Sequence, residues 1–249
     1  MDSCEKILTE KLGENLHYFE EVDSTNTFAK EMSEWDNGTV IIANAQTAGR
    51  GTYGRKFHSR AGSGIYMTMM INTDLWHFKN EKLATIYTAV AVSEAIAKVT
   101  KISPAVKWVN DLFVNSKKIG GILTGKDFNS DKLIIGIGIN LSGKQQDFPD
   151  EIKNIAASLK LDPPLDDQAA AIVLEIYEKM LKEGSLSDED IILKLYREKL
   201  FIMGKVVDIR YNSDVFEALV VAVDHKGRLV VLRNGEKLSL SAGEVMVKA

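Results

Sequence analysis

The stretch AGRGTYGRKFHSRAGSGIYMTMMI, residues 48–71, joins a loop rich in glycine and arginine to a strongly apolar segment. Gly49, Gly51 and Gly54 have the G-x-G-x-x-G spacing of a dinucleotide-binding turn. Such a turn must open a helix whose N-terminus receives the pyrophosphate, but the alternation over 65–71 predicts a strand. The run TVIIANAQ before the loop predicts another strand. The order strand, loop, strand therefore argues against a dinucleotide-binding fold.

The loop carries the basic side chains of Arg50, Arg55, Lys56 and Arg60. Arginine presents planar, permanently charged donors that match the oxygens of a phosphate or carboxylate. A protein-kinase glycine loop also lies between strands, but the downstream kinase motifs are missing. On these residues alone, an anion-binding loop and a solvated basic hairpin explain the pattern equally well.

The composition narrows the class of protein. The chain has 249 residues, 45% of them hydrophobic, and a net charge of −4, which argues against wrapping nucleic acid. Cys4 is the single cysteine, so an intrachain disulfide and a cysteine-based zinc site are excluded. The N-terminus lacks the apolar core of a secretory signal, and runs such as LIIGIGINL are too short to span a bilayer. We expect a soluble, cytoplasmic protein that does not bind membranes.

Hydrophobic periodicity predicts the remaining elements. A helix over 26–33 is capped by Ser24 or Thr25, and 81–99 reads as a long buried helix. The expected strands are 19–22, 39–46, 65–71, 107–114, 118–125 and 133–141. The other expected helices are 156–159, 168–183 and 188–199.

Two features of these elements bear on function. Asn115 and Ser116 predict a tight turn between the strands 107–114 and 118–125. The strand 133–141 has glycine at 136 and 138 on one face and isoleucine on the other, which indicates a close approach to its backbone or easier strand packing.

From Gly204 the chain changes to short strands with turns, typical of a small all-β unit.

Five segments in this order resemble biotin protein ligases. They are DSTN at 23–26, QTAGRGTYGR at 46–55, KWVND at 107–111, GGILT at 120–124 and GIGIN at 136–140, and the C-terminal unit with SAGEV at 241–245 looks like the small barrel of these enzymes. The resemblance implies an α+β fold in which helices flank a mixed β-sheet, as in class II synthetases. It also implies a catalytic domain of residues 1–203 and an SH3-like barrel of residues 204–249.

The resemblance implies a two-step ligase reaction. Biotin and ATP form biotinyl-5'-AMP, and the biotinyl group then passes to a lysine of a biotin carboxyl carrier protein. Because a carboxylate is already nucleophilic at neutral pH, the first step needs positioned positive charge rather than a nucleophilic side chain. Magnesium is implied with ATP, without nameable protein ligands. A homodimer is also implied, and the segment before the first strand is too short for a helix-turn-helix, so no DNA binding is expected.

Site residues follow from matching these motifs to the family pattern. The candidate catalytic residues are Lys107 and Arg50. The candidate biotin-binding residues are Ser24, Thr25, Asn26, Gln46, Gly49, Arg50, Gly51, Thr52, Lys107, Gly121 and Gly138. The candidate ATP-binding residues are Arg50, Arg55, Trp108, Asn110 and Asn140. Ser24 and Thr25 are alternatively simple helix caps, and Lys107 is alternatively a surface lysine.

The chain departs from the commoner family pattern at three positions. Thr52 and Phe57 stand where arginine and tryptophan are frequent, and Val109 replaces a proline. Loss of the guanidinium at Thr52 predicts a weaker hold on the adenylate. Two other functions stay open: a lipoate or octanoate ligase with the same adenylation chemistry, and a noncatalytic biotin sensor.

Overall fold

The computed structural model describes residues 3–75, 80–126, 131–162, 165–183, 188–212 and 214–246. The larger of its two sheets has seven strands in the order β1-β2-β3-β7-β6-β5-β4. These are β1 (Leu16–Val22), β2 (Thr39–Gln46), β3 (Gly64–Asn72), β4 (Ala105–Lys107), β5 (Asp111–Val114), β6 (Lys117–Lys126) and β7 (Lys132–Asn140). β1 and β2 are parallel, and the other neighbours are antiparallel. The expected mixed sheet is thus confirmed.

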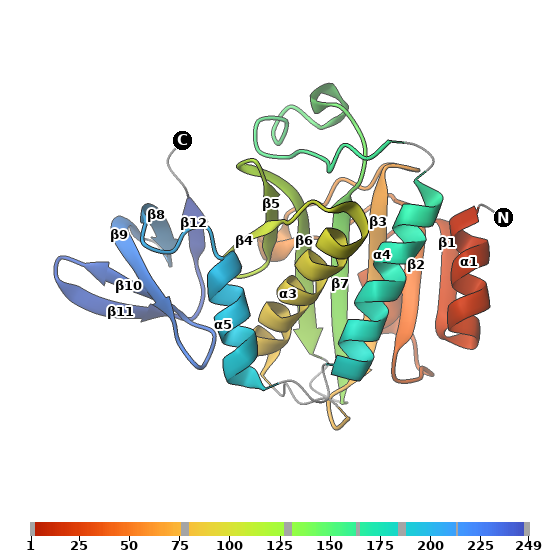
Figure 1. Ribbon diagram of the computed structural model, residues 1–249, viewed down its shortest axis with the longest axis horizontal. Helices are drawn as coiled ribbons and strands as arrows, with labels where there is room; N and C mark the ends of the chain where they lie inside the picture. Colours follow the sequence, from red (N-terminus) through yellow and green to blue (C-terminus); the bar gives the residue numbers. More distant parts are fainter. Residues whose placement is uncertain are drawn as a thin grey trace.

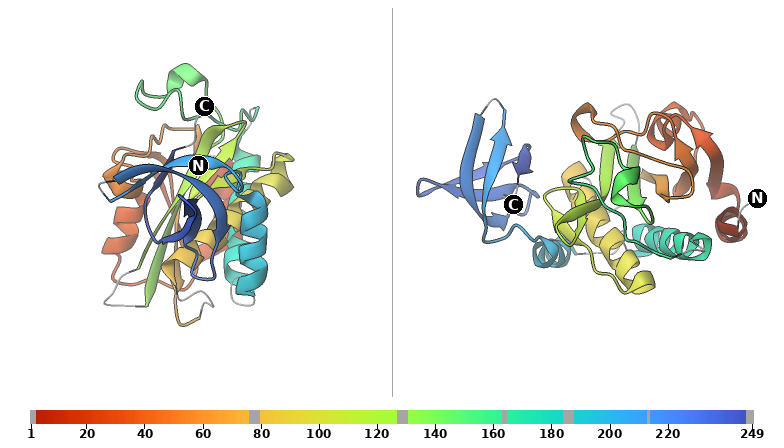
Figure 2. Two further views of the ribbon diagram at one scale, coloured as in Figure 1. Left: turned by 90° about the vertical axis from the view of Figure 1, so that its left-hand side faces the viewer. Right: turned by 90° about the horizontal axis from the view of Figure 1, so that it is seen from above.

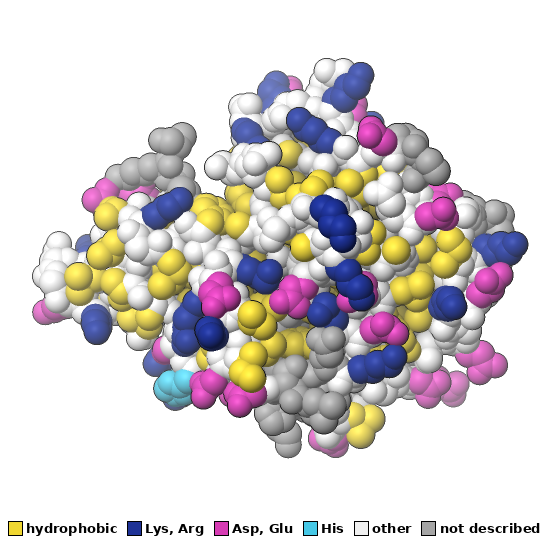
Figure 3. Space-filling view, viewed as in Figure 1, with side chains coloured by type: hydrophobic (Ala, Val, Ile, Leu, Met, Phe, Trp, Pro, Cys, Tyr) yellow, Lys and Arg dark blue, Asp and Glu magenta, His cyan; other side chains and the backbone are white. Residues whose placement is uncertain are grey.

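Helices cover both faces of this sheet unequally. One face carries α1 (Ser3–Leu12), α3 (Glu81–Thr100), α4 (Asp166–Glu178) and α5 (Glu189–Lys199), as Figure 1 shows. Basic and acidic side chains are interspersed over this helical layer (Figure 3). The other face carries α2 (Thr25–Glu31) beside the glycine-rich loop. The expected α+β architecture is confirmed, and the uneven covering leaves room for a site on the α2 face.

The two faces of β7 explain its alternating sequence. Ile135, Ile137 and Ile139 are at most 3% exposed and belong to the large core under the helical layer. On the opposite face, a Cβ at Gly136 would lie 2.4 Å from the Asn26 amide, and one at Gly138 would lie 2.6 Å from the Phe57 ring. These glycines therefore admit other side chains close to the sheet.

Helix α3 is the long buried helix expected from sequence. Asn80 caps it by accepting a hydrogen bond from the Lys82 amide at 2.9 Å. Among the described residues it is the helix long and apolar enough to cross a membrane, by length and composition only. Because 72% of its most apolar window is buried inside the protein, it has the environment of a core helix.

The hairpin of β5 and β6 forms at the predicted turn. Asn115 and Ser116 have φ values of 49° and 61°, as a two-residue type I′ turn requires. The preceding run KWVNDLFV is not one strand, because a turn over 108–110 separates β4 from β5. The Trp108–Val109 peptide bond within this turn is cis.

Two expectations for the helices were wrong or incomplete. Residues 156–159 are not helical: the Ala157 amide donates to the Lys118 carbonyl and the Leu159 amide to the Asn140 carbonyl, which holds this segment extended against the sheet. Four residues cannot outweigh such strand-like hydrogen bonds. Helix α1 was not predicted, and α4 ends at Glu178, where a π-helix continues over Lys179–Glu183.

The second sheet follows in the C-terminal part of the chain (Figure 2). Its strands β8 (Val206–Tyr211), β9 (Asp214–Val223), β10 (Leu229–Arg233), β11 (Glu236–Leu240) and β12 (Glu244–Met246) have the order β11-β10-β9-β8-β12. These pairings run in a row, so they establish an antiparallel sheet but not a closed barrel. The Trp108 indole donates to the Gly227 carbonyl at 3.0 Å, which joins the two sheets.

Candidate active site

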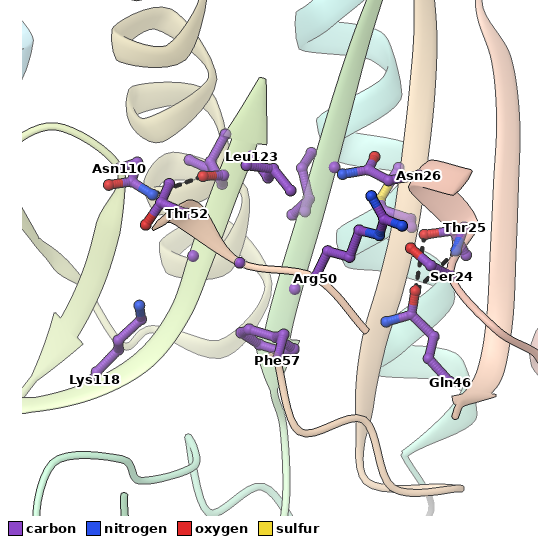
Figure 4. Close-up of a pocket in the computed structure, with 17 residues that line it drawn as sticks. Ser24, Thr25, Asn26, Gln46, Arg50, Thr52, Phe57, Asn110, Lys118 and Leu123 are labelled. Carbon is purple, nitrogen blue, oxygen red and sulfur yellow. Dashed lines mark hydrogen bonds between the residues drawn. The ribbon is translucent and has the colours of Figure 1, made fainter. Parts of the chain in front are cut away.

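A cavity opens on the α2 face of the large sheet. Elements far apart in sequence form it: the start of α2, the end of β2, the glycine-rich loop, and the middle of β6 and β7 (Figure 4). Its lining consists of Ser24, Thr25, Asn26, Gln46, Arg50, Gly51, Thr52, Phe57, Met67, Asn110, Lys118, Gly121, Ile122, Leu123, Gly136, Ile137 and Gly138. Ten of the residues expected from sequence therefore meet in one cavity.

One end of the cavity is a buried hydrogen-bond network. The Gln46 side-chain oxygen accepts from the Thr25 amide at 2.9 Å and from the Thr25 hydroxyl at 3.2 Å. The Thr68 hydroxyl lies 2.8 Å from the Thr25 hydroxyl and 2.9 Å from the Asn26 side-chain oxygen. Because each group is held by another, the donors and acceptors at this end have set directions.

Ser24 combines the two roles that the sequence left open. Its hydroxyl accepts from the Thr27 amide at 3.4 Å as the N-cap of α2, and the residue also lines the cavity. Thr25 is the first residue of the helix rather than its cap. Capping thus places Thr25 and Asn26 beside the cavity.

The glycine-rich loop folds back on itself over the cavity. The Phe57 amide donates to the Gly49 carbonyl at 2.9 Å, and the Gly51 amide donates to the Arg55 carbonyl at 2.7 Å. A Cβ at Gly49 would lie 2.5 Å from the Phe57 carbonyl oxygen, so only glycine admits this close crossing. Figure 4 shows the Arg50 side chain crossing β7 toward the Ser24–Asn26 end.

Two lysines and one carboxylate form a charged cluster next to the other side of the cavity; Lys118 lines the cavity, whereas Lys107 and Asp111 do not. The Asp111 carboxylate lies 2.6 Å from the Lys118 amine and 3.7 Å from the Lys107 amine. The Lys107 side chain is 18% exposed, and its amine lies 5.3 Å from the centre of the Phe113 ring. Burial lowers the pKa of the Lys107 amine below its usual value, although Asp111 acts in the opposite direction.

These opposing effects on the pKa of Lys107 predict a pH dependence of activity if the reaction requires the cationic form of this lysine. Asp111→Asn removes the carboxylate that favours the charged amine, while Lys118 and Arg55 still lower the pKa of Lys107 and Glu244 still raises it. The pKa of Lys107 then falls further, so activity is lost at a lower pH on the alkaline side. A profile of kcat/KM against pH measures the shift, because it reports the free enzyme. An unchanged alkaline limb of the profile in Asp111→Asn would contradict this role. The side chain introduced by Lys107→Arg stays charged over the whole pH range, so the profile of that variant should have no alkaline limb.

Several expected site residues lie outside the cavity lining. Arg55 pairs with Glu244 of the C-terminal sheet at 2.7 Å. Trp108 is 5% exposed and points into the junction of the two sheets. Asn140 donates to the Ala157 carbonyl at 3.0 Å. Asn110 does line the cavity, and its amide is held by the Ile122 carbonyl at 2.7 Å.

Sequence reasoning missed Lys118 and Thr68. Lys118 was read only as part of a strand, and its approach to Asp111 depends on the register shift between Leu112 and Phe113, which no local pattern reveals. Thr68 is fully buried in an otherwise apolar strand. A buried hydroxyl in such a strand needs a partner, and that was a usable signal for a polar network.

Comparisons with known proteins agree with this arrangement. The model of the biotin/lipoate A/B protein ligase family matches residues 18–141. The bifunctional ligase/repressor BirA of Bacillus spizizenii is 34% identical over 231 residues, covering 90% of this chain and 71% of that protein. The biotin–[acetyl-CoA-carboxylase] ligase of Mycobacterium tuberculosis is 25% identical over 220 residues, covering 84% and 79%.

A solved structure supports the same relationship over nearly the whole chain. The biotin protein ligase from Aquifex aeolicus in complex with biotin and ATP has a TM-score of 0.74 and 29% sequence identity. The match covers 93% of this chain and 97% of that one. Given the shared sheet, the cavity on its α2 face and these similarities, the chain belongs to the biotin/lipoate A/B protein ligase family.

Proposed function

We propose that this chain is an ATP-dependent biotin–protein ligase that forms biotinyl-5'-AMP and transfers the biotinyl group to a lysine of a biotin carboxyl carrier protein. The observation that supports this proposal most strongly is that polar, charged and apolar groups line different parts of one cavity. Thr25, Asn26 and Gln46 offer directed hydrogen bonds at one end, Lys118 supplies a cation at the opposite side, and the Arg50 side chain reaches across β7 toward the polar end. Apolar side chains and Gly138 complete the lining. Biotin has matching parts: a hydrogen-bonding ureido ring, an apolar chain and a carboxylate.

The chain's residues supply what adenylation requires. A biotin carboxylate oxygen attacks the α-phosphorus of ATP, a P–O bond forms, and pyrophosphate leaves with the electrons of the broken bond. Arg50, Lys107 and Lys118 offset the repulsion between the two anions and the charge that develops on the phosphate. The glycine-rich loop covers this region and limits access of water to the mixed anhydride.

The second step consumes the adenylate. The neutral amine of the carrier lysine attacks the acyl carbon, the C–O bond between the acyl group and the phosphate breaks so that AMP leaves, and the nitrogen releases a proton as the amide forms. Magnesium, when bound with ATP, neutralises phosphate charge. Among the described residues no cluster of three or more His, Cys, Asp or Glu side chains could hold a metal ion, so phosphates and water are its expected main ligands.

The competing ligands differ from biotin in the group that would face the polar end of the cavity. Lipoate and octanoate have no ureido group, so they would leave the network of Thr25, Asn26 and Gln46 without ligand partners, which is unfavourable for buried polar groups. A noncatalytic sensor would not need two lysines around Asp111 as well as Arg50. The geometry therefore favours biotin and catalysis.

Pyrophosphate release tests this proposal directly. The purified chain is incubated with ATP and magnesium, and biotin, lipoate and octanoate are compared as substrates. Biotin-dependent release, followed by mass increase of a biotin carboxyl carrier domain, is expected. Release with lipoate or octanoate instead would contradict the biotin assignment, and no release with any acid would favour a sensor.

Thr52 provides a further test of adenylate retention. Thr52 lines the cavity at the turn of the loop, where an arginine would add a guanidinium near the phosphate. Thr52→Arg is expected to slow release of biotinyl-5'-AMP by about tenfold, because charge-assisted hydrogen bonds are stronger than neutral ones. Rapid filtration of enzyme charged with radiolabelled adenylate measures the rate. No slowing would contradict the hypothesis.

Three broader features belong to the same proposal. We propose a catalytic unit of residues 1–203 with a smaller unit of 204–249, a homodimer and a cytoplasmic location. The second sheet, which begins at Val206, supports the division into two units. The single cysteine, which has no partner for an intrachain disulfide, supports the cytoplasmic location. Light scattering over a concentration series tests the dimer.

A further inference from the structure

The face of β7 that carries the glycines also packs against α2 along the length of the helix. Because side chains alternate along a strand, Lys132, Ile134, Gly136 and Gly138 share one face. Ile134 packs in a small core with Ala29 of α2. At the other end, the space left by Gly136 receives the Asn26 side chain. Successive positions of this face therefore meet successive parts of the helix.

Lys132 holds the C-terminal end of the helix. The residue is only 5% exposed, and its amine donates to the Met32 carbonyl at 2.7 Å and to the Ala29 carbonyl at 3.4 Å. The last carbonyls of a helix lack partners within it, so a lysine there satisfies them. The amine also lies 5.7 Å from the centre of the Trp35 ring. A buried cation is costly unless it is paired in this way.

The opposite end of α2 reaches the cavity. Thr25 and Asn26 form the first turn, and both join the network through Thr68. A helix of seven residues is not stable by itself, so its position depends on contacts at both ends. A shift of the C-terminal end would therefore move the groups that face the ligand.

We propose that Lys132 is a positioning residue for ligand binding: by holding the C-terminal carbonyls of α2 against β7, it sets Thr25 and Asn26 at the polar end of the cavity. Lys132 touches no lining residue through these bonds and acts through the helix. The ligand class rests on the proposed function, namely a small acid with a hydrogen-bonding ring such as biotin. Affinity for that ring, rather than the chemical step, depends on Lys132.

Steady-state adenylation kinetics test the role. Lys132→Met keeps the length and apolar stem but removes the donors. The variant is expected to raise the KM for biotin roughly tenfold, with kcat and the KM for ATP within about twofold. Lys132→Arg retains donors and should restore the KM for biotin to within about threefold of the wild type. Lys132→Gln, with fewer donors, serves in its place should Lys132→Met fail to fold.

A matched, partly buried lysine separates positioning from general stability. Lys179, in the π-helix that continues α4, has 14% side-chain exposure and pairs with Glu94 of α3 at 3.0 Å. Lys179→Met should lower thermal stability without changing the KM for biotin. An unchanged KM in every Lys132 variant, with only a smaller active fraction, would overturn the proposal.

Calorimetric titration with biotin alone gives the same answer without catalysis. Weaker binding is expected in Lys132→Met and Lys132→Gln, and affinity near the wild type is expected in Lys132→Arg. Failure of the proposed function would appear differently, as absence of biotin binding and of pyrophosphate release in the unmodified chain. Equal affinity in all variants, with normal binding by the wild type, would instead contradict the role of Lys132 alone.

Discussion

Replacing Lys107 by alanine is expected to lower kcat for biotin-dependent pyrophosphate release by about 10²–10³-fold, the cost of removing one preorganised group that stabilises developing charge. The Lys107 amine is mostly buried beside Asp111 and Phe113, where screening by water is weak. Its charge is therefore more effective than that of an exposed lysine. Single-turnover measurement of biotinyl-5'-AMP formation isolates the step from product release.

The control for Lys107→Ala is Lys179→Ala, another partly buried lysine with a carboxylate partner. Both variants lose an ion pair, so a general effect on folding should appear in both melting temperatures. Adenylation should fall only in Lys107→Ala. Wild-type rates in Lys107→Ala would remove this lysine from the chemical step and leave Arg50 and Lys118 as the candidate cations.

Replacing Gly49 by alanine has the second largest expected effect, a loss of about 10²-fold in kcat/KM for biotin. The added methyl group would lie 2.5 Å from the Phe57 carbonyl oxygen and 2.8 Å from the Ser59 hydroxyl. Backbone must move to relieve the first contact, and the loop that carries Arg50 moves with it. Displacement of a positioned group by about 1 Å is enough for a loss of this size.

Gly125→Ala is the matched control for this glycine. A Cβ at Gly125 in β6 meets no atom within 4 Å, so its activity should stay close to that of the wild type. Gly49 is buried within the loop but outside the large apolar core, so Gly49→Ala should lower the melting temperature only modestly and leave the chain folded. A large loss of stability in Gly49→Ala, or full activity, would contradict the role of the close crossing.

The predictable part of the fold came from segments with strong local patterns. Alternation placed β3 and β7, the apolar run TVIIANAQ placed β2, and the buried run of α3 placed its helix with nearly correct ends. The residues 156–159 were misassigned because their conformation depends on hydrogen bonds to distant strands. Helix α1 has few apolar residues and is held by packing against α4, so its own sequence is a weak signal.

The candidate site was likewise predictable from the sequence only in part. Ser24, Thr25, Asn26 and Gln46 were expected through motif resemblance, and the parallel register of β1 and β2 brings Val22 opposite Gln46, which explains why they meet. Trp108 was expected near ATP, which stays a prediction; the structure shows that its indole donates to the Gly227 carbonyl at the junction with the C-terminal sheet. A side chain's direction after a turn depends on what surrounds it, and a motif does not contain that information.

The sequence by itself therefore determined several of the main strands, the long helix α3, the glycine-rich loop between two strands, and the types of residue available for an anionic ligand. These follow from local periodicity and from chemistry that each side chain has anywhere. Only the tertiary structure decided that Asp111 joins two lysines, that Thr68 supports the polar end, and that Lys132 holds α2. Those relations join residues up to 103 positions apart, and they exist only because the folded sheet brings distant segments within hydrogen-bonding distance.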